Sequence, residues 1–248
     1  MKPPSKSLLR FTLLVATLLL THSSFFWLPP SLACLITFGT VAFLLHGTLR
    51  PNSKLFGPIT SHTGTEQIHL TIDDGPDPLT TEPLLRLLEQ HGVKATFFLI
   101  GEEARKHPDL VRAISRAGHT LGNHTQTHPQ FNFWHLGPWR TTKEIVSNQA
   151  TLRELSGTTP RLFRAPVGHS NFFTHPVLKA ENLQLIGWSA RAYDCSKRPL
   201  DSMKYLLNRD LKPGAIILIH ESTPHAEEIL LHVLTEAKEK GLSFSNRL

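Results

Sequence analysis

The chain has 248 residues, of which 40% are hydrophobic and 19% are charged, the composition of a globular protein with one good core and room for an appendage. Five Lys or Arg and no acidic residue lie in residues 1–55, so residues 56–248 hold 21 basic against 20 acidic residues, a net charge of +1. This distribution argues against a basic nucleic-acid-binding face, and we expect no nucleic-acid partner. The two cysteines, Cys34 and Cys195, are too few for a disulfide framework.

Two strongly apolar stretches, Leu8–Leu28 and Leu32–Leu49, follow the basic N-terminus. At about 1.5 Å per helical residue, each is long enough to cross the hydrocarbon core of a membrane. We therefore expect residues 1–50 to be a membrane anchor built as a hairpin of two transmembrane helices. The sequence leaves two alternatives open, a single span with an interfacial helix and a cleaved signal peptide whose apolar region is Phe11–Leu20.

The basic residues around these stretches predict their orientation. Lys and Arg precede the first stretch, and Arg50 and Lys54 follow the second, whereas the connection Thr21–Ser31 has neither. Because positive charge favours the cytoplasmic side, a hairpin places the rest of the chain on the cytoplasmic face of the membrane, expected to be a bacterial inner membrane. A single span would instead export it.

Residues 51–66 are predicted to be a linker, because Pro, Gly, Ser and Thr dominate this segment without periodicity. From Gln67 onward, short apolar runs favour strands: Gln67–Ile72, Ala95–Ile100, His119–Gly122, Leu162–Arg164, Gln184–Trp188 and Ala215–His220. Amphipathic stretches between them favour helices: Thr81–His91, Glu102–Ala117, Thr141–Ser156, His175–Asn182, Asp201–Asp210 and His225–Lys240. This alternation predicts an α/β fold with a parallel sheet, open or closed into a barrel.

Polar residues stand where the predicted strands end. "HLTIDDGPDP" contains Asp73 and Asp74, adjacent carboxylates in a place where repulsion and desolvation both disfavour them. "GNHTQTH" supplies His124 and His128, which on one helical turn would face the same side. Carboxyl ends of parallel strands meet at one edge, so two imidazoles and one carboxylate would form a catalytic zinc site. The alternatives are a solvated Asp turn and a chance spacing among 15 histidines.

Two more strand ends carry polar residues. Arg164 follows a short strand in "LFRAPVG", and His220 ends the run "GAIILIH". A guanidinium is the natural partner of the aspartate that does not bind metal, and it would keep that carboxylate ionised in a partly buried site. The alternatives are an ordinary salt bridge for Arg164 and a structural role for His220.

Together these motifs resemble those of the polysaccharide deacetylases, the family that shares the NodB-homology domain, over residues 67–245. The resemblance rests on four motifs, which are "TIDDG" (Thr71–Gly75), "HTQTH" (His124–His128), "RAPVG" (Arg164–Gly168) and "LIH" (Leu218–His220). It implies that this α/β catalytic domain is a distorted, incomplete (β/α) barrel, similar to a TIM barrel. It also implies a metal site at the carboxyl ends of the strands.

The resemblance implies roles for the strand-end residues. Asp74, His124 and His128 would hold a divalent metal, expected to be Zn²⁺. Asp73 would be the catalytic base, and Arg164 would hold it in place and ionised.

Further roles follow from the same resemblance. His220 would protonate the leaving amine, and Asp194 would raise the pKa of His220 so that it is charged near neutrality. The backbone N–H of Val167 would stabilise the oxyanion. Leu218 and Cys195 would line the pocket for the acyl group.

The fourth motif departs from the family pattern. That pattern is Asp-x-x-Asp-Trp, whereas the aligned residues here are Arg191-Ala-Tyr-Asp194-Cys195, and Val167 replaces an aromatic residue of the third motif. Because Cys is smaller than Trp, the pocket has room for an acyl group or a sugar that differs from the family norm.

The implied function is metal-dependent hydrolysis of a non-peptide C–N amide bond, removing N-acetyl groups from an amino-sugar oligo- or polysaccharide or a lipid-linked saccharide. The expected partners are this N-acylated carbohydrate and the lipid bilayer. Two alternatives remain, a deformylase acting on a lipid-linked amino sugar and an inactive sugar-binding module. Retention of Asp73 and His220 argues against the inactive module, because pure binding needs neither.

Overall fold

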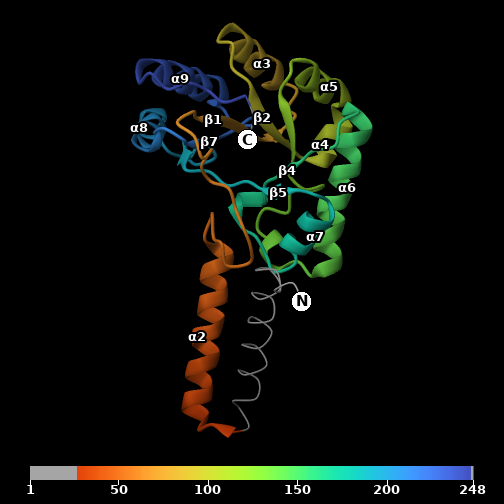
Figure 1. The fold of residues 1–248 in the computed structure, drawn as a ribbon, viewed down its shortest axis with the longest axis vertical. Helices are drawn as coiled ribbons and strands as arrows, with labels where there is room; N and C mark the ends of the chain where they lie inside the picture. Colours follow the sequence, from red (N-terminus) through yellow and green to blue (C-terminus); the bar gives the residue numbers. More distant parts are fainter. Residues whose placement is uncertain (1–26, 247) are drawn as a thin grey trace, which may run out of the picture.

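A computed structural model of the protein describes residues 27–246 and 248 (Figure 1). Within these residues one curled sheet has the strand order β5-β4-β3-β2-β1-β7-β6. The strands are β1 (His69–Gly75), β2 (Ala95–Leu99), β3 (Thr120–Asn123), β4 (Leu162–Phe163), β5 (Gln184–Leu185), β6 (Ala190–Arg191) and β7 (Ile216–His220). All of these strands pair in parallel, so the predicted α/β class is confirmed.

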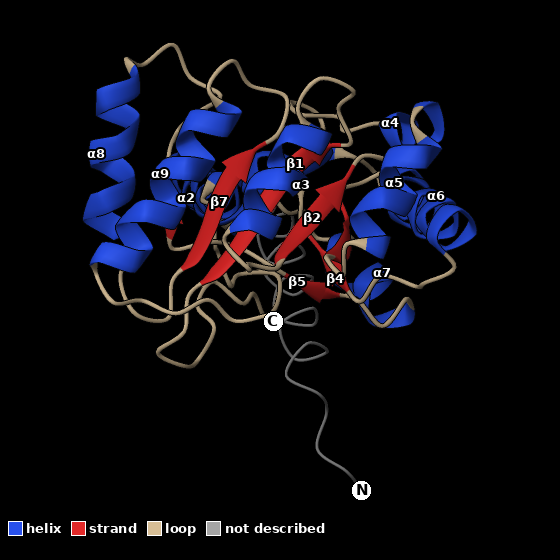
Figure 2. Ribbon diagram, turned by 90° about the horizontal axis from the view of Figure 1, so that it is seen from above, coloured by secondary structure: helices blue, strands red, loops and turns tan. Residues whose placement is uncertain are grey.

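Helices cover the outer face of the sheet (Figure 2). They are α3 (Thr81–Gln90), α4 (Gly101–Lys106), α5 (Pro108–Arg116), α6 (Pro138–Ser156), α7 (Thr174–Ala180), α8 (Leu200–Asp210) and α9 (Ala226–Glu239), and two short 3-10 turns are η1 (Phe133–His135) and η2 (Pro166–Gly168). Each longer helix turns one apolar stripe toward the sheet, as Leu84 and Leu88 do on α3. The central strands are buried on both faces, which is why β2 reads as the continuous run "ATFFL".

The sheet is an incomplete barrel, as the family resemblance implied. Its two edge strands, β5 and β6, follow each other in the chain and are joined by residues 186–189 without a helix. The concave side encloses a second apolar cluster beneath the strand ends, which includes Phe98, Trp188 and Leu218.

Three local expectations were wrong. The single helix expected over Glu102–Ala117 is two helices, because Pro108 lacks an N–H and disfavours a helical conformation at His107, whose φ and ψ are −126° and 58°. Helix α6 begins three residues before Thr141, with Pro138 in its first turn. Strand β6 was not expected, since two residues carry no alternation to detect.

The segment 51–66, predicted to be a linker, is fastened to the barrel. Thr60 bridges Ile186 just after β5, and His62 bridges Ala215 just before β7. The Thr63 N–H donates to the Gly214 carbonyl at 2.9 Å. The segment is thus held on both sides of the open edge, and the proposed domain limits at 50 and 66 remain predictions.

Helix α2 (Pro30–Leu49) extends away from the barrel (Figure 1). An 18-residue stretch of this 20-residue helix has a mean hydropathy of 1.8, and large apolar side chains such as Leu35 and Phe38 are exposed along it. By length and composition it could cross a membrane, although a signal sequence has the same features. The other stretch, Leu8–Leu28, lies almost wholly outside the described residues, so the predicted hairpin of two transmembrane helices remains a prediction.

Candidate active site

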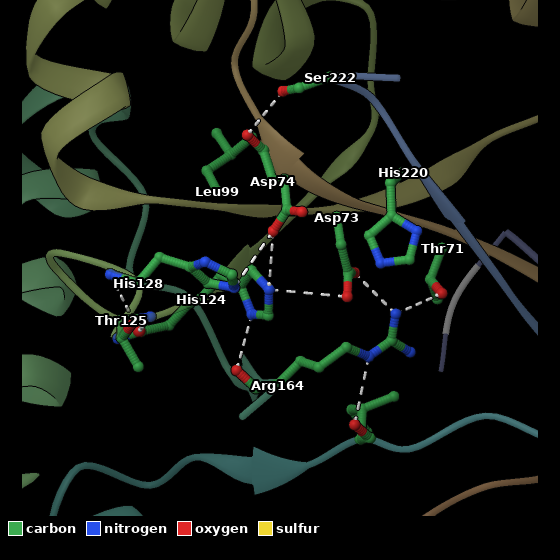
Figure 3. Close-up of polar contacts among 12 residues, drawn as sticks. Thr71, Asp73, Asp74, Leu99, His124, Thr125, His128, Arg164, His220 and Ser222 are labelled. Atoms are coloured by element: carbon green, nitrogen blue, oxygen red, sulfur yellow. Dashed lines mark hydrogen bonds and ion pairs between the residues drawn. The ribbon is translucent and has the colours of Figure 1, made fainter. Parts of the chain in front are cut away.

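The sequence-predicted polar residues meet at the carboxyl ends of β1, β3, β4 and β7 (Figure 3). The parallel register places Asp73 opposite His220 on the neighbouring strand β7. His124 and Arg164 directly follow β3 and β4. Because parallel strands end at the same edge, residues almost 150 positions apart become neighbours through strand pairing.

Asp74 and two imidazoles converge on one point. The Asp74 Oδ1 atom lies 3.2 Å from His124 Nε2 and 3.3 Å from His128 Nε2. Figure 3 shows both rings turned toward this carboxylate. The two histidines lie on an irregular loop, not on the helical turn that the spacing predicted. Positive φ angles of 68° at Thr125 and 50° at His128 turn the chain so that both rings face Asp74.

This cluster has the electrostatics of a cation site. Burial alone would raise the pKa of Asp74, but the imidazoles of His124, His128 and His220 lower it below its ordinary value. Burial and the charge of His124 lower the pKa of His128 to about 4, so its ring is neutral at pH 7. Burial also opposes a charge on His124, yet the carboxylates of Asp73 and Asp74 raise its pKa. The two carboxylates thus favour one positive charge at this point.

The donor set fits a divalent metal ion. Two imidazole nitrogens and one carboxylate oxygen lie within 4.8 Å of one another, which is the ligand composition of many catalytic zinc sites. Asp74 Oδ1 is buried and makes no hydrogen bond of good geometry. His124 Nδ1 lies 2.8 Å from the Arg164 carbonyl oxygen, which orients the ring and leaves Nε2 for a metal.

Asp73 has different surroundings from its neighbour. It is 2% exposed, and its Oδ1 accepts a hydrogen bond of 2.8 Å from Arg164 Nη1. The same nitrogen donates to Thr71 Oγ1 at 2.6 Å, and the guanidinium carbon lies 4.3 Å from the centre of the Phe98 ring. Asp74 therefore lies between two imidazoles, whereas Asp73 is bonded to a buried guanidinium and has His124 Nε2 at 3.7 Å from its other oxygen.

Residues that sequence reasoning missed hold Arg164 from the other side. Its Nη2 donates to the Gly187 carbonyl at 2.8 Å and its Nε to the Ile186 carbonyl at 3.3 Å. Asn52 clamps the next residue, because its Nδ2 donates to the Trp188 carbonyl at 2.7 Å and its Oδ1 accepts from the Trp188 N–H at 3.2 Å. Nothing in the sequence around Asn52 indicates a partner 136 positions away.

A second missed residue is Glu221, which braces the turn after the aspartate pair. It is fully buried, and its carboxylate accepts hydrogen bonds from the Thr81 hydroxyl and, at 3.2 Å, from the Asp77 N–H. Burial raises the pKa of Glu221 to about 7. A Cβ at Gly75 would lie 1.9 Å from Glu221 Oε2, so any larger residue there would displace this buried carboxylate.

His220 is oriented by Asp194, as the resemblance implied. Asp194 accepts two hydrogen bonds, at 2.8 Å from His220 Nδ1 and at 2.6 Å from the His220 N–H. Burial would lower the pKa of His220, but Asp194 and Cys195 raise it well above its ordinary value. The ring is therefore protonated near neutrality.

The residues predicted to line a pocket fall in different places. Cys195 is exposed, and its sulfur lies within 4.8 Å of ligand atoms of Asp74 and His220. Val167 is 39% exposed, with a φ of 49° in η2. Leu218 is only 2% exposed and packs inside the barrel below the site.

Arg191 stacks on aromatic rings. It stands where the family's fourth motif, Asp-x-x-Asp-Trp, has its first aspartate. Its guanidinium carbon lies 4.2 Å from the centre of the Tyr193 ring and 5.5 Å from that of Trp188. Arg198 also lies over Tyr193, at 5.4 Å. This edge of the site is a cationic and aromatic surface instead of an acidic one.

The curled parallel half-barrel and its strand-end cluster define the protein as a member of the polysaccharide deacetylases. Residues 60–186, about half of the chain, match the family described as polysaccharide deacetylase. The chain belongs to this family, and the family prediction made from the four motifs is confirmed.

Individual relatives agree with this assignment. The peptidoglycan-N-acetylglucosamine deacetylase of Bacillus cereus is 34% identical over 183 residues, which are 72% of this chain and 66% of that protein, just under two thirds. A chitooligosaccharide deacetylase of Bradyrhizobium is 34% identical over 67% of this chain and 75% of that protein. The solved structure of a family 4 carbohydrate esterase from Streptomyces lividans in complex with acetate is 32% identical, has a TM-score of 0.67, and is matched over 73% of this chain and 92% of that chain.

Proposed function

We propose that this protein is a metal-dependent deacetylase that removes N-acetyl groups from an amino-sugar glycan. The observation that supports the proposal is that two adjacent carboxylates have different partners. Asp74 lies between the imidazoles of His124 and His128, and Asp73 is bonded to the Arg164 guanidinium. Such a pair can bind a cation with one member and move a proton with the other. The named substrates of two relatives, peptidoglycan N-acetylglucosamine and chitooligosaccharide, suggest N-acetylglucosamine units as the substrate.

Asp74, His124 and His128 would hold the divalent ion, for which Zn²⁺ suits the nitrogen and oxygen donors. When bound, the ion supplies Lewis-acid activation of water and of the amide carbonyl. Asp73, kept ionised by Arg164, accepts the proton of the attacking water.

The opposite side of the site serves the leaving group. His220, held by Asp194 and protonated near neutrality, donates its proton to the departing amine. The N–H of Val167 stabilises the oxyanion as a backbone donor, a role that does not depend on the side chain at that position. Cys195 borders the acyl group beside His220.

Measurement of acetate and formate released from chitooligosaccharides and from lipid-linked amino sugars tests this function. Acetate release that disappears in the Asp73→Asn variant supports the proposal. Formate release from the lipid-linked sugar alone would replace the deacetylase with a deformylase. Binding of glycan without either product, in metal-loaded protein, would indicate an inactive sugar-binding module.

The N-terminal helix serves as the membrane anchor in this proposal. As the second helix of the predicted hairpin, α2 spans the bilayer, and Arg50 and Lys54, which follow it, keep the catalytic domain on the cytoplasmic side. A reporter fused after Leu248 tests the orientation. Fluorescence from a reporter that folds only in the cytoplasm supports it, whereas activity of a phosphatase that requires export would place the domain outside.

A further inference from the structure

Three segments of the chain are devoid of acidic residues. None of the 20 Asp and Glu residues lies in 49–65, 127–143 or 164–180. Apart from Arg164, which is buried on Asp73, the basic residues of these segments are all exposed: Arg50, Lys54, Arg140, Lys143 and Lys179. Arg140, Lys143 and Lys179 therefore form a local excess of positive charge in residues 56–248, whose net charge is only +1, and Arg50 and Lys54 add to it.

The three segments form one continuous surface. The Phe56 ring from the first segment packs edge-on against Phe172 of the third, with 6.4 Å between ring centres. Asn171 Nδ2 of the third segment donates to two groups of the second, the Phe133 carbonyl at 2.8 Å and Thr141 Oγ1 at 3.1 Å. We call this surface, built from 49–65, 127–143 and 164–180, the acid-free face.

Large aromatic side chains project from this face. Trp139 is 87% exposed and Phe131 is 80% exposed, which makes them two of the three most exposed large apolar residues in the described chain after residue 50. The Trp134 indole N–H is bonded to the Phe131 carbonyl at 2.9 Å, so a further ring lies beside them. Exposed Trp and Phe among Lys and Arg are typical of surfaces that lie at the headgroup level of a membrane.

The acid-free face lies at the end of the barrel from which α2 departs. Figure 1 shows the lower ends of α6 and α7 at the level of the upper end of α2. The end of α6 near α7 is its first turn, because Thr141 in that turn accepts a hydrogen bond from Asn171, which lies just before α7. Trp139 belongs to the same turn. The side chain of Asn52, three residues after α2, is bonded to both the N–H and the carbonyl of Trp188. These bonds fix the position of the C-terminal end of α2 relative to the acid-free face.

We propose that the acid-free face lies on an anionic lipid surface. Phe131 and Trp139 insert between the headgroups, and the exposed Lys and Arg residues face the lipid phosphates. The proposal rests on α2 acting as the anchor, and it does not depend on deacetylase activity. The loop that carries His124 and His128 ends three residues before Phe131. With Phe131 in the headgroups, the active site therefore lies close to the bilayer. Glycans attached to lipid, or lying against the membrane, are the substrate class that this arrangement selects.

Quenching of tryptophan fluorescence tests the contact directly. The full chain is reconstituted into vesicles of phosphatidylcholine and phosphatidylglycerol whose acyl chains are brominated near the headgroup. The quenched signal of Trp139, obtained as the difference between the wild type and Trp139→Phe, is expected to be large. A matched control is Tyr205→Trp on α8, 69% exposed in the wild type and distant from α2 in Figure 1, which should add a tryptophan that is not quenched. Unquenched Trp139, or equal quenching of both, overturns the proposal.

Enzyme kinetics on soluble and on lipid-linked substrates show whether Phe131 and Trp139 contact lipid or bind sugar. We expect the double variant Phe131→Ser and Trp139→Ser to keep the kcat and KM of the wild type on soluble chitooligosaccharide. On a lipid-linked glycan in anionic vesicles its turnover should fall at least several-fold. The control pair Tyr205→Ser and Leu231→Ser should match the wild type in both assays. A rise in KM for the soluble substrate would show that the aromatic residues bind sugar and would overturn the proposal.

The two proposals can fail separately. Quenched Trp139 in a protein without deacetylase activity would refute the proposed function and leave the lipid contact standing. Full activity on soluble glycan with unquenched Trp139 would refute the lipid contact alone.

Discussion

The two halves of the active site are built in opposite ways. In the half formed by Asp73, His124 and Arg164, each of these three residues is at most 2% exposed, and hydrogen bonds and ion pairs hold their side chains. In the half formed by Val167 and Cys195, both side chains reach solvent.

The difference has a physical cause. A buried charge without full pairing costs several kcal/mol, about 3–5 when one partner of a buried pair is removed. Residues such as Arg164, whose guanidinium is bonded to four residues and stacks on Phe98 and Trp188, therefore tolerate little change. An exposed position carries no such penalty, so the family's Trp can become Cys195 without loss of the fold. In the proposed mechanism the buried half sets the chemistry and the exposed half sets the selectivity.

The buried half should show the largest effects. Replacing Asp73 with Asn keeps the shape of the side chain and removes the base, so turnover should fall by about 10²–10⁴ while bound metal is retained. The variants Asp74→Ala, His124→Ala and His128→Ala should lose both metal and activity, because each removes a ligand. Metal analysis of purified proteins alongside acetate release measures both properties. Retention of metal by Asp74→Asn together with its loss in Asp73→Asn would show that the two roles are reversed.

The Asp194–His220 pair should control the pH dependence. The pKa of His220 is raised, so the stabilising contribution of its charge is complete below the unfolded value of about 6.5 and is lost as the pH rises through the folded value. Activity should decline over the same alkaline range, since the protonated ring is the proposed acid. In Asp194→Asn this decline should move to lower pH, and kcat at pH 7 should fall by about tenfold or more. An unchanged pH profile of kcat would show that His220 is not the acid.

The clamp on Trp188 links the segment after α2 to the buried half. Asn52 has a φ of 64°, a conformation that glycine adopts without strain, so Asn52→Gly removes the clamp and spares the backbone. The Gly187 carbonyl that binds Arg164 shares a peptide group with the Trp188 N–H, so loss of the clamp frees it to move. We therefore expect kcat to fall by about tenfold, while KM and metal content stay unchanged. Asn52→Asp keeps an acceptor for the Trp188 N–H and should recover part of the loss. Equal activity in all three proteins would restrict Asn52 to a structural role.

The exposed half should show the smallest effect, and it should concern selectivity. Cys195→Trp fills space beside His220, so the preference for acetyl over longer acyl chains should rise by about tenfold. Cys195→Ser, which preserves the size of the side chain, is the control and should leave the preference unchanged. A folded Cys195→Trp protein with the acyl profile of the wild type would show that this residue lies outside the acyl pocket.

Much of the site could be read from the sequence, because its chemistry sits at strand ends. Asp73, Asp74, Arg164 and His220 each follow an apolar run, and parallel strands bring their carboxyl ends to one edge. The family assignment followed from the same motifs. Helix boundaries set by local chemistry were also accessible in principle, as the break at Pro108 illustrates.

Other features were decided only by tertiary structure. The clamp of Asn52 on Trp188 spans 136 positions, and Glu221 packs against a glycine almost 150 positions earlier. The acid-free face exists because three distant segments fold together, whereas the net charge of the whole chain beyond residue 55 is close to zero. Composition averages over the chain, but a surface depends on which side chains the fold gathers, and that selection is made by long-range packing and hydrogen bonds.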